Sequence, residues 1–248
     1  MKKRPMILAC ALILLIACDD IPAPDEIDPN FGTNRFDSRE RETALGDMIC
    51  DALVWYVNHG AIAGSVHPVD FAVLNGGIFE FGLEKGEITA GMTTGMIKGD
   101  FITTVRISAA QVKELFVWLA TLRLGDNAWS QVSEEVKVTI DWTNGMGQLR
   151  ALEIKGIPID TAIAANATYY IATGDVLVHG KRNSMVDRFF PALKAVYDAH
   201  RTGPNVTDTD RAYVDQRPQL VSDAVYAYVG SRPRPYTPEI DGRITIEK

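Results

Sequence analysis

The sequence has few of the residues that several classes of protein require. Among its 248 residues are four histidines and three cysteines, and 32 Asp and Glu outnumber 25 Lys and Arg. A basic field that would release counterions from a phosphate backbone is missing, so no nucleic-acid partner is expected. The sequence also lacks a P-loop, a dinucleotide fingerprint and a Gly-x-Ser-x-Gly elbow. What is present, 46% apolar and 23% charged residues, is typical of a folded globular chain.

No apolar run is long enough to cross a membrane. Lys2, Lys3 and Arg4 precede an apolar run from Met6 to Ala17. About twelve residues at 1.5 Å each fall short of roughly 30 Å of hydrocarbon. A short apolar run behind basic residues predicts a secretion signal over residues 1–17.

The residues around Cys18 suggest how the exported chain is held. The segment Leu15-Ile16-Ala17-Cys18 resembles the bacterial lipoprotein box, whose cysteine thiol receives a diacylglyceryl group. An acidic, proline-containing stretch follows, so residues 18–34 are expected to form a lipidated tether. This predicts a lipid anchor in the bacterial cell envelope, facing the periplasm or the exterior. The alternative is a simple secreted protein in which Cys18 has no role.

Only Cys50 remains for the folded part, because Cys10 leaves with the signal and Cys18 carries the lipid. An internal disulfide is therefore excluded. Cys50 lies on the apolar side of an expected helix, which favours a small buried side chain over a nucleophile.

Periodicity predicts one domain over residues 35–248. Apolar residues recur at i, i+4 spacing from Ala44 to a stop at Gly60, which indicates a helix. Ser108 with Gln111 forms a capping box where a strand turns into a second helix. Further strands are expected at 70–74, 102–107, 136–142, 149–154 and 168–173, and further helices near 185–200 and 220–228. The fold class expected is α+β, with a mixed β-sheet flanked by helices.

Short segments in a fixed order resemble the C-terminal domain of the 5'-nucleotidases and UDP-sugar hydrolases. Residues 39–52 (RERETALGDMICDA) resemble the family's opening Arg-x-x-Glu-Thr-x-Leu-Gly-Asn-Leu-Ile-x-Asp-Ala. Residues 70–77 (DFAVLNGG) are similar to its strand and Asn-Gly-Gly-Gly loop, and residues 107–113 to its Leu-Thr-Gly-x-Gln-Leu-Lys step. Weaker matches follow at 86–89, 131–133, 155–160, 169–175 and 238–244. The resemblance covers about 210 residues.

The resemblance implies a division of labour that this sequence does not repeat. In the family, this domain holds the base and sugar of a nucleotide, while a separate metallophosphoesterase domain carries two metals. None of the four histidines here lies in that domain's metal-binding contexts. The nearest fragment, Asn58-His59-Gly60, falls at the end of the first expected helix, where a histidine is typical of a cap. We therefore expect no catalytic residue, no metal ligand and no cofactor.

The same resemblance suggests binding residues. Arg35 and Arg39 match the two arginines of the family's first segment, which face the ligand, and Asn75 matches the asparagine that bonds the base. Gly76 and Gly77 follow in the loop, where a close backbone approach is expected. An arginine suits such a site because its planar fork holds a carboxylate or phosphate by two bonds. Alternatively, these arginines pair with neighbouring glutamates on the surface.

Three positions depart from the family pattern. Glu80 stands where the family has a further ligand arginine, and Lys98 and Ser184 stand where two aromatic rings clamp the base. Stacking on such a ring is typically worth about 1–3 kcal/mol per base. Phe79 or Phe81 could replace the lost rings, although both are more typical of core residues.

Two interpretations of the changed pocket stay open. In one, Arg39, Lys98, Lys181 and Arg182 form a cationic cleft for a phosphorylated or carboxylated ligand, and Glu80 orients an amine or a sugar hydroxyl. In the other, the pocket no longer binds a ligand and Glu80 forms a salt bridge with Lys98, a contact that adds little stability at a surface.

The sequence thus favours an envelope-anchored domain that binds a nucleotide-like or small anionic ligand and is not catalytic on its own. One alternative is a nucleotide hydrolase of nucleotide catabolism that acts with a separate metallophosphoesterase chain. A second alternative is a structural or interaction lipoprotein with a dead pocket. An apolar patch beside the folded N-terminus would favour a catalytic partner.

Overall fold

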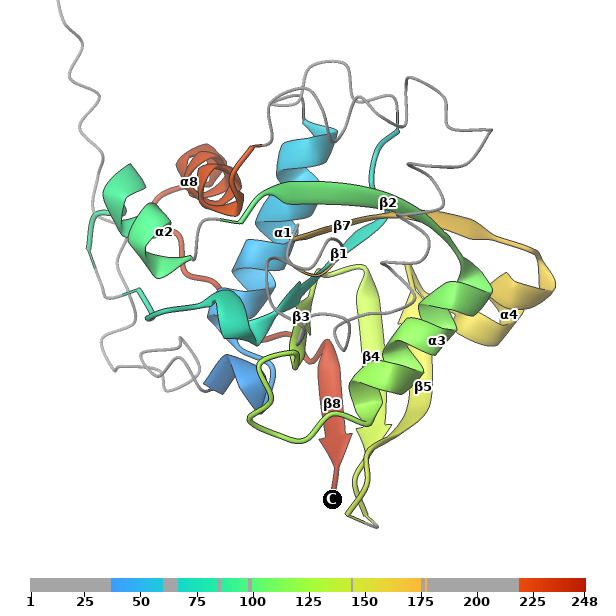
Figure 1. The fold of residues 1–248 in the computed structure, drawn as a ribbon. Coiled ribbons are helices and arrows are strands. Elements are labelled where there is room, and N and C mark those ends of the chain that lie inside the picture. Colours follow the sequence, from blue (N-terminus) through green and yellow to red (C-terminus); the bar gives the residue numbers. More distant parts are fainter. Residues whose placement is uncertain are drawn as a thin grey trace, which may run out of the picture.

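Two four-stranded sheets and the helices packed on them form the architecture (Figure 1). The computed structural model describes residues 37–59, 67–83, 86–97, 100–143, 145–174, 177 and 219–248. Its helices are α1 (Ala44–Asn58), α2 (Ala90–Met96), α3 (Ala109–Ala120), α4 (Ile159–Ala164) and α8 (Val221–Ser231), with 3-10 turns η2 (Asp37–Arg39) and η3 (Gly76–Ile78). Its strands are β1 (Phe71–Asn75), β2 (Ile102–Ser108), β3 (Ser130–Val132), β4 (Val136–Asp141), β5 (Gln148–Ile154), β6 (Ile157–Pro158), β7 (Thr168–Gly174) and β8 (Ile244–Glu247).

The first sheet, in the order β2-β7-β1-β3, is buried on both faces. β1 is parallel to β7, while β2 and β3 run antiparallel to their neighbours. Side chains alternate along β1, so that Phe71 and Val73 enter one core and Ala72 and Leu74 enter the other. A strand with two buried faces explains why this segment is a continuous apolar run.

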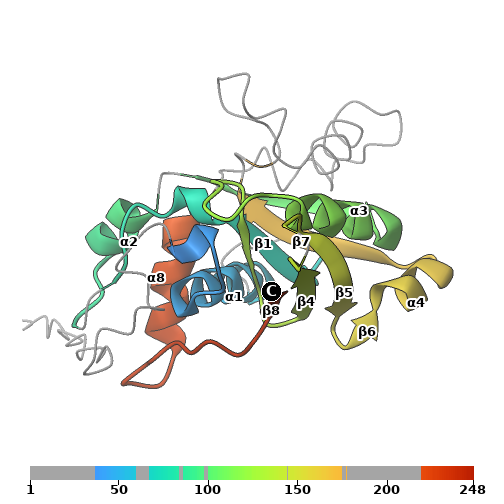
Figure 2. The same cartoon turned by 90° about the horizontal axis from the view of Figure 1, so that it is seen from below.

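Each face of the first sheet has its own cover. Figure 2 shows α1, α2 and α8 gathered on one side of the molecule and α3 and α4 on the other. The helices α1, α2 and α8 share a core with one face of the sheet. The other face shares a core with α3 and with the second sheet, whose order is β6-β5-β4-β8.

Local signals set the helix ends as expected. The Oγ of Ser108 accepts from the backbone N–H of Gln111 at 3.2 Å, and the Gln111 side chain accepts from the N–H of Ser108 at 2.9 Å. This confirms the predicted capping box. The first helix ends at Asn58, and His59 caps it by donating its backbone N–H to the carbonyl of Trp55 at 2.8 Å. Cys50 is fully buried, as expected.

The expected α+β class is confirmed, but the strands form two mixed sheets where one was expected. The chain leaves the first sheet after β3 and starts the second at β4, only a few residues later. Five short elements were not anticipated, namely α2, α4, β3, β6 and β8. The helix expected near 185–200 lies outside the described residues.

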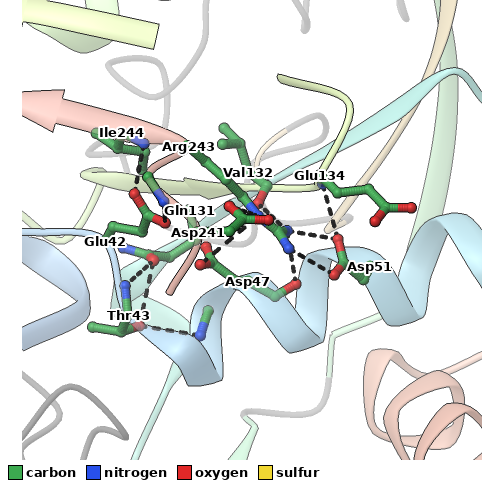
Figure 3. A network of polar contacts seen from close by, with 12 residues as sticks. Glu42, Thr43, Asp47, Asp51, Gln131, Val132, Glu134, Asp241, Arg243 and Ile244 are labelled. Carbon is green, nitrogen blue, oxygen red and sulfur yellow. Dashed lines mark hydrogen bonds and ion pairs between the residues drawn. The ribbon is translucent and has the colours of Figure 1, made fainter. Parts of the chain in front are cut away.

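A buried arginine joins β8 to α1 and β3 (Figure 3). Arg243, only 4% exposed, donates from Nη1 and Nη2 to the two carboxylate oxygens of Asp51 at 2.6 and 2.9 Å. Its Nε donates to Asp241 at 2.9 Å, and Nη1 also donates to the carbonyl of Val132 at 3.2 Å. Burial alone disfavours the charged guanidinium, but the hydrogen bonds and charge of Asp51 and the hydrogen bond to Asp241 raise the pKa of Arg243. The two parallel bonds fix β8 against α1.

Glu42 holds the start of β8 from the other side. Its carboxylate oxygens accept from the backbone N–H groups of Gly242 at 2.8 Å and Ile244 at 2.7 Å. Glu42 is 6% exposed and Asp47 is 1% exposed. Asp47, Asp51 and Asp241 lie within 3.8 Å of the Arg243 guanidinium, and Glu42 lies beside Asp47 and Asp241.

Asp47 is the member of this cluster that keeps its proton. No described group donates a hydrogen bond to either of its oxygens, and the Nε of Arg243 lies 3.8 Å away. Burial raises the pKa of Asp47 from 3.8 to about 9, because the nearby charge of Arg243 does not offset desolvation and the charge of Glu42 adds to it. The neutral acid can donate to Glu42.

Replacement of Asp47 by Asn should stabilise the protein at neutral and alkaline pH. The folded pKa lies above the unfolded value, so folding retains a proton that the unfolded chain releases, and the free energy of unfolding falls as pH rises from about 4 to about 9. Asp47→Asn removes this loss and should add at least about 1.4 kcal/mol at pH 8, the worth of one pKa unit. Urea denaturation of both proteins at pH 5 and pH 8 measures the change in the free energy of unfolding.

The control for this prediction is Glu114→Gln, which neutralises an exposed carboxylate on α3 and should change the pH dependence little. A loss of stability in Asp47→Asn at both pH values would mean instead that Asp47 is an ionised partner of Arg243.

Candidate functional site

The predicted binding residues meet where β1 ends. Asn75 closes the strand, Gly76 and Gly77 open the 3-10 turn η3, and the turn η2 with Arg39 lies against it. The Oγ of Ser38 donates to the carbonyl of Gly76 at 3.2 Å. The turn that bears Arg39 and the loop that bears Asn75, far apart in the sequence, are thus in contact.

The two glycines are required by close backbone approach. A Cβ on Gly76 would lie 2.1 Å from the carbonyl oxygen of Ser38, and one on Gly77 would lie 2.6 Å from the carbonyl oxygen of Asn127. Both neighbours are backbone atoms, which cannot swing aside. The groups that approach these glycines are the chain's own backbone, so their expected role toward a ligand stays a prediction.

Asn75 presents an unused acceptor. Its Nδ2 donates to the carbonyl of Asn127 at 3.0 Å, while its Oδ1 has no hydrogen-bond partner in the described part of the chain. The residue is 7% exposed. Because a buried polar atom without a partner costs free energy, this oxygen suits a donor brought by a ligand.

Arg39 is half-buried at the end of η2. Its carbonyl accepts from the N–H of Gly125 at 2.8 Å, so the turn also touches the loop that leads to β3. Among its glutamate neighbours, Glu42 directs its carboxylate inward to Gly242 and Ile244.

Glu80 lies on the next stretch of the same loop. Its backbone N–H donates to the carbonyl of Met96 at 2.8 Å, and Phe79 pairs with Ile97 in an antiparallel bridge. Phe79 is 1% exposed and belongs to the core, so it cannot act as a stacking ring. Phe81 is 44% exposed, and its ring lies beside Gly95 of α2. Of the two candidate rings, the structure leaves Phe81 accessible.

Several predicted site residues lie outside the described part of the chain. These are Arg35, Lys98, Lys181 and Arg182, together with Cys18 and Ser184. The cationic cleft and the alternative bridge between Glu80 and Lys98 therefore stay predictions.

One group of acids has the spacing of a metal site. Oxygens of Glu42, Asp47 and Asp241 lie within 4.8 Å of one another. Both oxygens of Glu42 already accept backbone N–H groups, and Arg243 supplies a positive charge beside the other two. A cation would have to displace that guanidinium, so the residues present fit a buried ion pair better than a metal.

The sequence did not indicate the residues that hold the η2 turn and the Asn75 loop in place. Ser38, Gln131 and Asn127 support the loop through hydrogen bonds. The only signal was the short match at 131–133, which carried no role. Ser38 and Asn127 lie in short turns, where the pattern of apolar residues gives no direction to a side chain.

Comparison with known proteins agrees with the fold. Residues 25–195 match the family described as 5'-nucleotidase, C-terminal domain. The trifunctional nucleotide phosphoesterase protein YfkN of Bacillus subtilis (strain 168) is 30% identical over 147 residues, which cover 57% of this chain and 10% of that protein. The chain thus spans a tenth of that relative's length.

Solved structures are similar in fold. The 5'-nucleotidase precursor of Thermus thermophilus has a TM-score of 0.57 at 17% identity, covering 87% of this chain and 37% of its own. The NAD nucleotidase of Haemophilus influenzae has a TM-score of 0.60 at 12% identity, and the match covers 92% of this chain and 36% of that protein. A 5'-nucleotidase-type protein of Staphylococcus aureus, solved in complex with alpha-ketoglutarate, has a TM-score of 0.50 at 13% identity, and the match covers 93% of this chain and 41% of that protein. At such identities the likeness establishes the fold alone.

Adding a methyl group at Gly76 should disrupt the packing of the η2 turn against the Asn75 loop. Gly76→Ala places its Cβ against the carbonyl oxygen of Ser38, and such overpacking typically costs about 1–3 kcal/mol. The free energy of unfolding, measured in urea, should fall by that amount. Gly230→Ala is the control, because its Cβ in α8 meets nothing within 4 Å and should stabilise the helix by up to about 1 kcal/mol. An unchanged Gly76→Ala protein would mean that the turn is not seated on this loop.

Proposed function

Because the chain belongs to the 5'-nucleotidase C-terminal domain family, we propose that it binds a nucleotide-like or other small anionic ligand at the Asn75 loop and is not catalytic on its own. The observation that carries the proposal is the buried Oδ1 of Asn75, an acceptor without a described donor, beside the turn that bears Arg39. One small molecule with a neutral donor and an anionic group could contact both the Asn75 oxygen and the Arg39 guanidinium.

The character of the ligand follows from these groups. The guanidinium of Arg39 suits a phosphate or a carboxylate, and the amide oxygen of Asn75 suits an N–H or O–H donor. Two structural neighbours are named nucleotidases, and a third was solved with alpha-ketoglutarate, a small dicarboxylate. Nucleotides and small dicarboxylates are therefore the two classes to test.

The absence of catalysis on its own is proposed from the family's division of labour. Hydrolysis there belongs to a metallophosphoesterase domain, and none of the four histidines of this sequence lies in that domain's metal-binding contexts. Exposed large apolar side chains in the described residues are spread over several elements, not gathered beside Asp37: Phe81, Val117, Met146, Ile157, Tyr226 and Ile240. The described surface thus singles out no docking patch near the folded N-terminus.

Attachment to the cell envelope is proposed from residues 1–34. The basic start, the short apolar run and Cys18 support a signal followed by a lipidated cysteine. Within the described residues, no helix combines the length and apolar character that a membrane span needs. The proposed location is the envelope, with the domain held by its lipid.

Ligand binding should appear as thermal stabilisation that depends on Arg39. We expect AMP, adenosine, a UDP-sugar, pyrophosphate, citrate or alpha-ketoglutarate to raise the Tm of the full chain in detergent. At 100-fold excess over its Kd, a ligand adds about 2.7 kcal/mol, or roughly 5–10 °C for a protein of this size. Arg39→Ala should weaken binding at least about tenfold, because a hydrogen bond to a charged group is worth roughly 1.5–3 kcal/mol.

The matched control is Arg150→Ala, which removes an exposed arginine from β5 in the second sheet and should leave the shift intact. No shift with any compound would contradict the binding proposal. Release of inorganic phosphate from AMP, abolished by a divalent-metal chelator, would contradict the proposal that the chain is not catalytic on its own.

Phe81 should contribute to ligands that contain a base and not to those that lack one. Phe81→Ala is expected to weaken the binding of AMP and adenosine by about 1–3 kcal/mol, the usual contribution of stacking, while citrate and pyrophosphate should bind as before. Isothermal titration calorimetry separates the two groups. Val117→Ala, which truncates a side chain of the same 44% exposure on α3, should affect neither. Equal weakening of all ligands by Phe81→Ala would indicate a general disturbance of the loop.

A further inference from the structure

Gln131 is a buried β3 residue whose side-chain amide is fully used. It is 0% exposed. Its Oε1 accepts from the N–H and the Oγ1 of Thr43 at 3.0 and 3.3 Å. Its Nε2 donates to the carbonyls of Ser38 at 2.9 Å and Arg41 at 2.8 Å. An amide offers two donors and two acceptor sites, so all four are occupied.

The two donor bonds end on either side of Arg39. The carbonyl of Ser38 precedes Arg39, and that of Arg41 follows it by two residues. A single NH2 group therefore holds both arms of the turn that presents the guanidinium. Figure 3 shows Gln131 reaching the chain beside Thr43 at the start of α1.

The same strand also supports the Asn75 loop. β3 pairs with β1 so that Gln131 lies opposite Leu74 and Ser130 lies opposite Asn75. The turn is tied to the loop a second time, since the Oγ of Ser38 donates to the carbonyl of Gly76. Gln131 is thus the common support of the two halves of the site.

Resting on the proposed function, we propose that Gln131 is a positioning residue of the ligand site, whose Nε2 holds the Arg39 turn in the geometry that meets a ligand anion. A turn that is already fixed pays no ordering cost when the ligand binds, so its support appears as affinity. Buried groups that lock the residues of a site act in this way.

The rival interpretation is that Gln131 only stabilises α1. Its Oε1 accepts from Thr43, whose Oγ1 in turn accepts from Gly46 N–H at 3.1 Å as the N-cap of that helix. Gln131→Glu separates the two roles, because a carboxylate keeps the acceptor for Thr43 and removes both donors. Because the new carboxylate is buried and faces the carbonyls of Ser38 and Arg41, Gln131→Glu should also lower the free energy of unfolding, a cost that the N-terminus of α1 offsets in part.

Hydrogen exchange of the full chain tests the positioning role directly. The amides of Glu40 and Arg41 both donate to the carbonyl of Asp37, at 3.0 and 3.1 Å, so their protection reports whether the turn stays closed. In Gln131→Glu they should exchange at least about tenfold faster. The control is Ser133→Ala, which removes the Oγ that accepts from Ala72 N–H at 2.8 Å on the same side of the fold and should not change them. Unchanged exchange in Gln131→Glu, or equal acceleration in both variants, would overturn the proposal.

Affinity for AMP then tests the link to Arg39. Gln131→Glu should lower the affinity for AMP about tenfold in the wild-type background and should have no further effect on it in an Arg39→Ala background. An equal loss in both backgrounds, or faster exchange with no loss of affinity, would contradict the proposal. If the natural chain does not bind AMP, the proposed function fails for that ligand, while the exchange result still decides whether Gln131 holds the turn.

Ser38→Ala is the second variant, in case Gln131→Glu does not fold. It removes the hydroxyl that bonds to the carbonyl of Gly76 and keeps the backbone carbonyl that accepts from Gln131. We expect weaker AMP binding with nearly unchanged unfolding in urea. AMP binding equal to that of the natural chain would count against the fixed turn.

Discussion

Arg243 carries a positive charge into the interior, where the arrangement of α1, β3 and β8 depends on how that charge is met. Removing a guanidinium from water is costly, and the cost is recovered only where carboxylates and carbonyls meet all its donors. Asp51 in α1, the carbonyl of Val132 in β3 and Asp241 just before β8 accept hydrogen bonds from this guanidinium. The pairing gives little net stability by itself, yet it permits only one placement of β8, because any other would bury unpaired charges.

The buried charges and the candidate site are connected through neighbouring residues. Glu42 belongs to the charged cluster, and Thr43, the next residue, is both the N-cap of α1 and a donor to Gln131. Gln131 in turn supports the carbonyls around Arg39. The candidate site therefore rests on the N-terminal end of α1 and on the buried edge strand β3, and support by regular elements is typical of a preorganised surface.

The sequence allowed good prediction wherever a local pattern dictates structure, and failed where only tertiary packing does. The strand before Asn75, the capping box at Ser108 and the α+β class follow from periodicity and hydrogen-bonding side chains, and all are confirmed. β3 has three residues and acquires its shape from pairing with β1, so no pattern announces it. Phe79 and Phe81 have the same strand parity, yet one is in the core and the other is half-exposed, because the loop turns between them. The hydrogen bonds of Gln131 join segments about ninety residues apart in the chain, so no local pattern indicates them.

The bonds around β8 also have a consequence for how the chain reaches its folded state. Those from Glu42 to residues 242 and 244 span 200 and 202 positions, and that from Arg243 to Asp51 spans 192. Contacts between such distant segments form only after a very long loop has closed, which slows folding more than it affects stability. Until β8 docks, the inner carboxylates of α1 remain hydrated and the edge of β4 stays open to other strands. Docking of the C-terminal strand closes the acidic interior to water and moves the open edge of this sheet from β4 to the short strand β8.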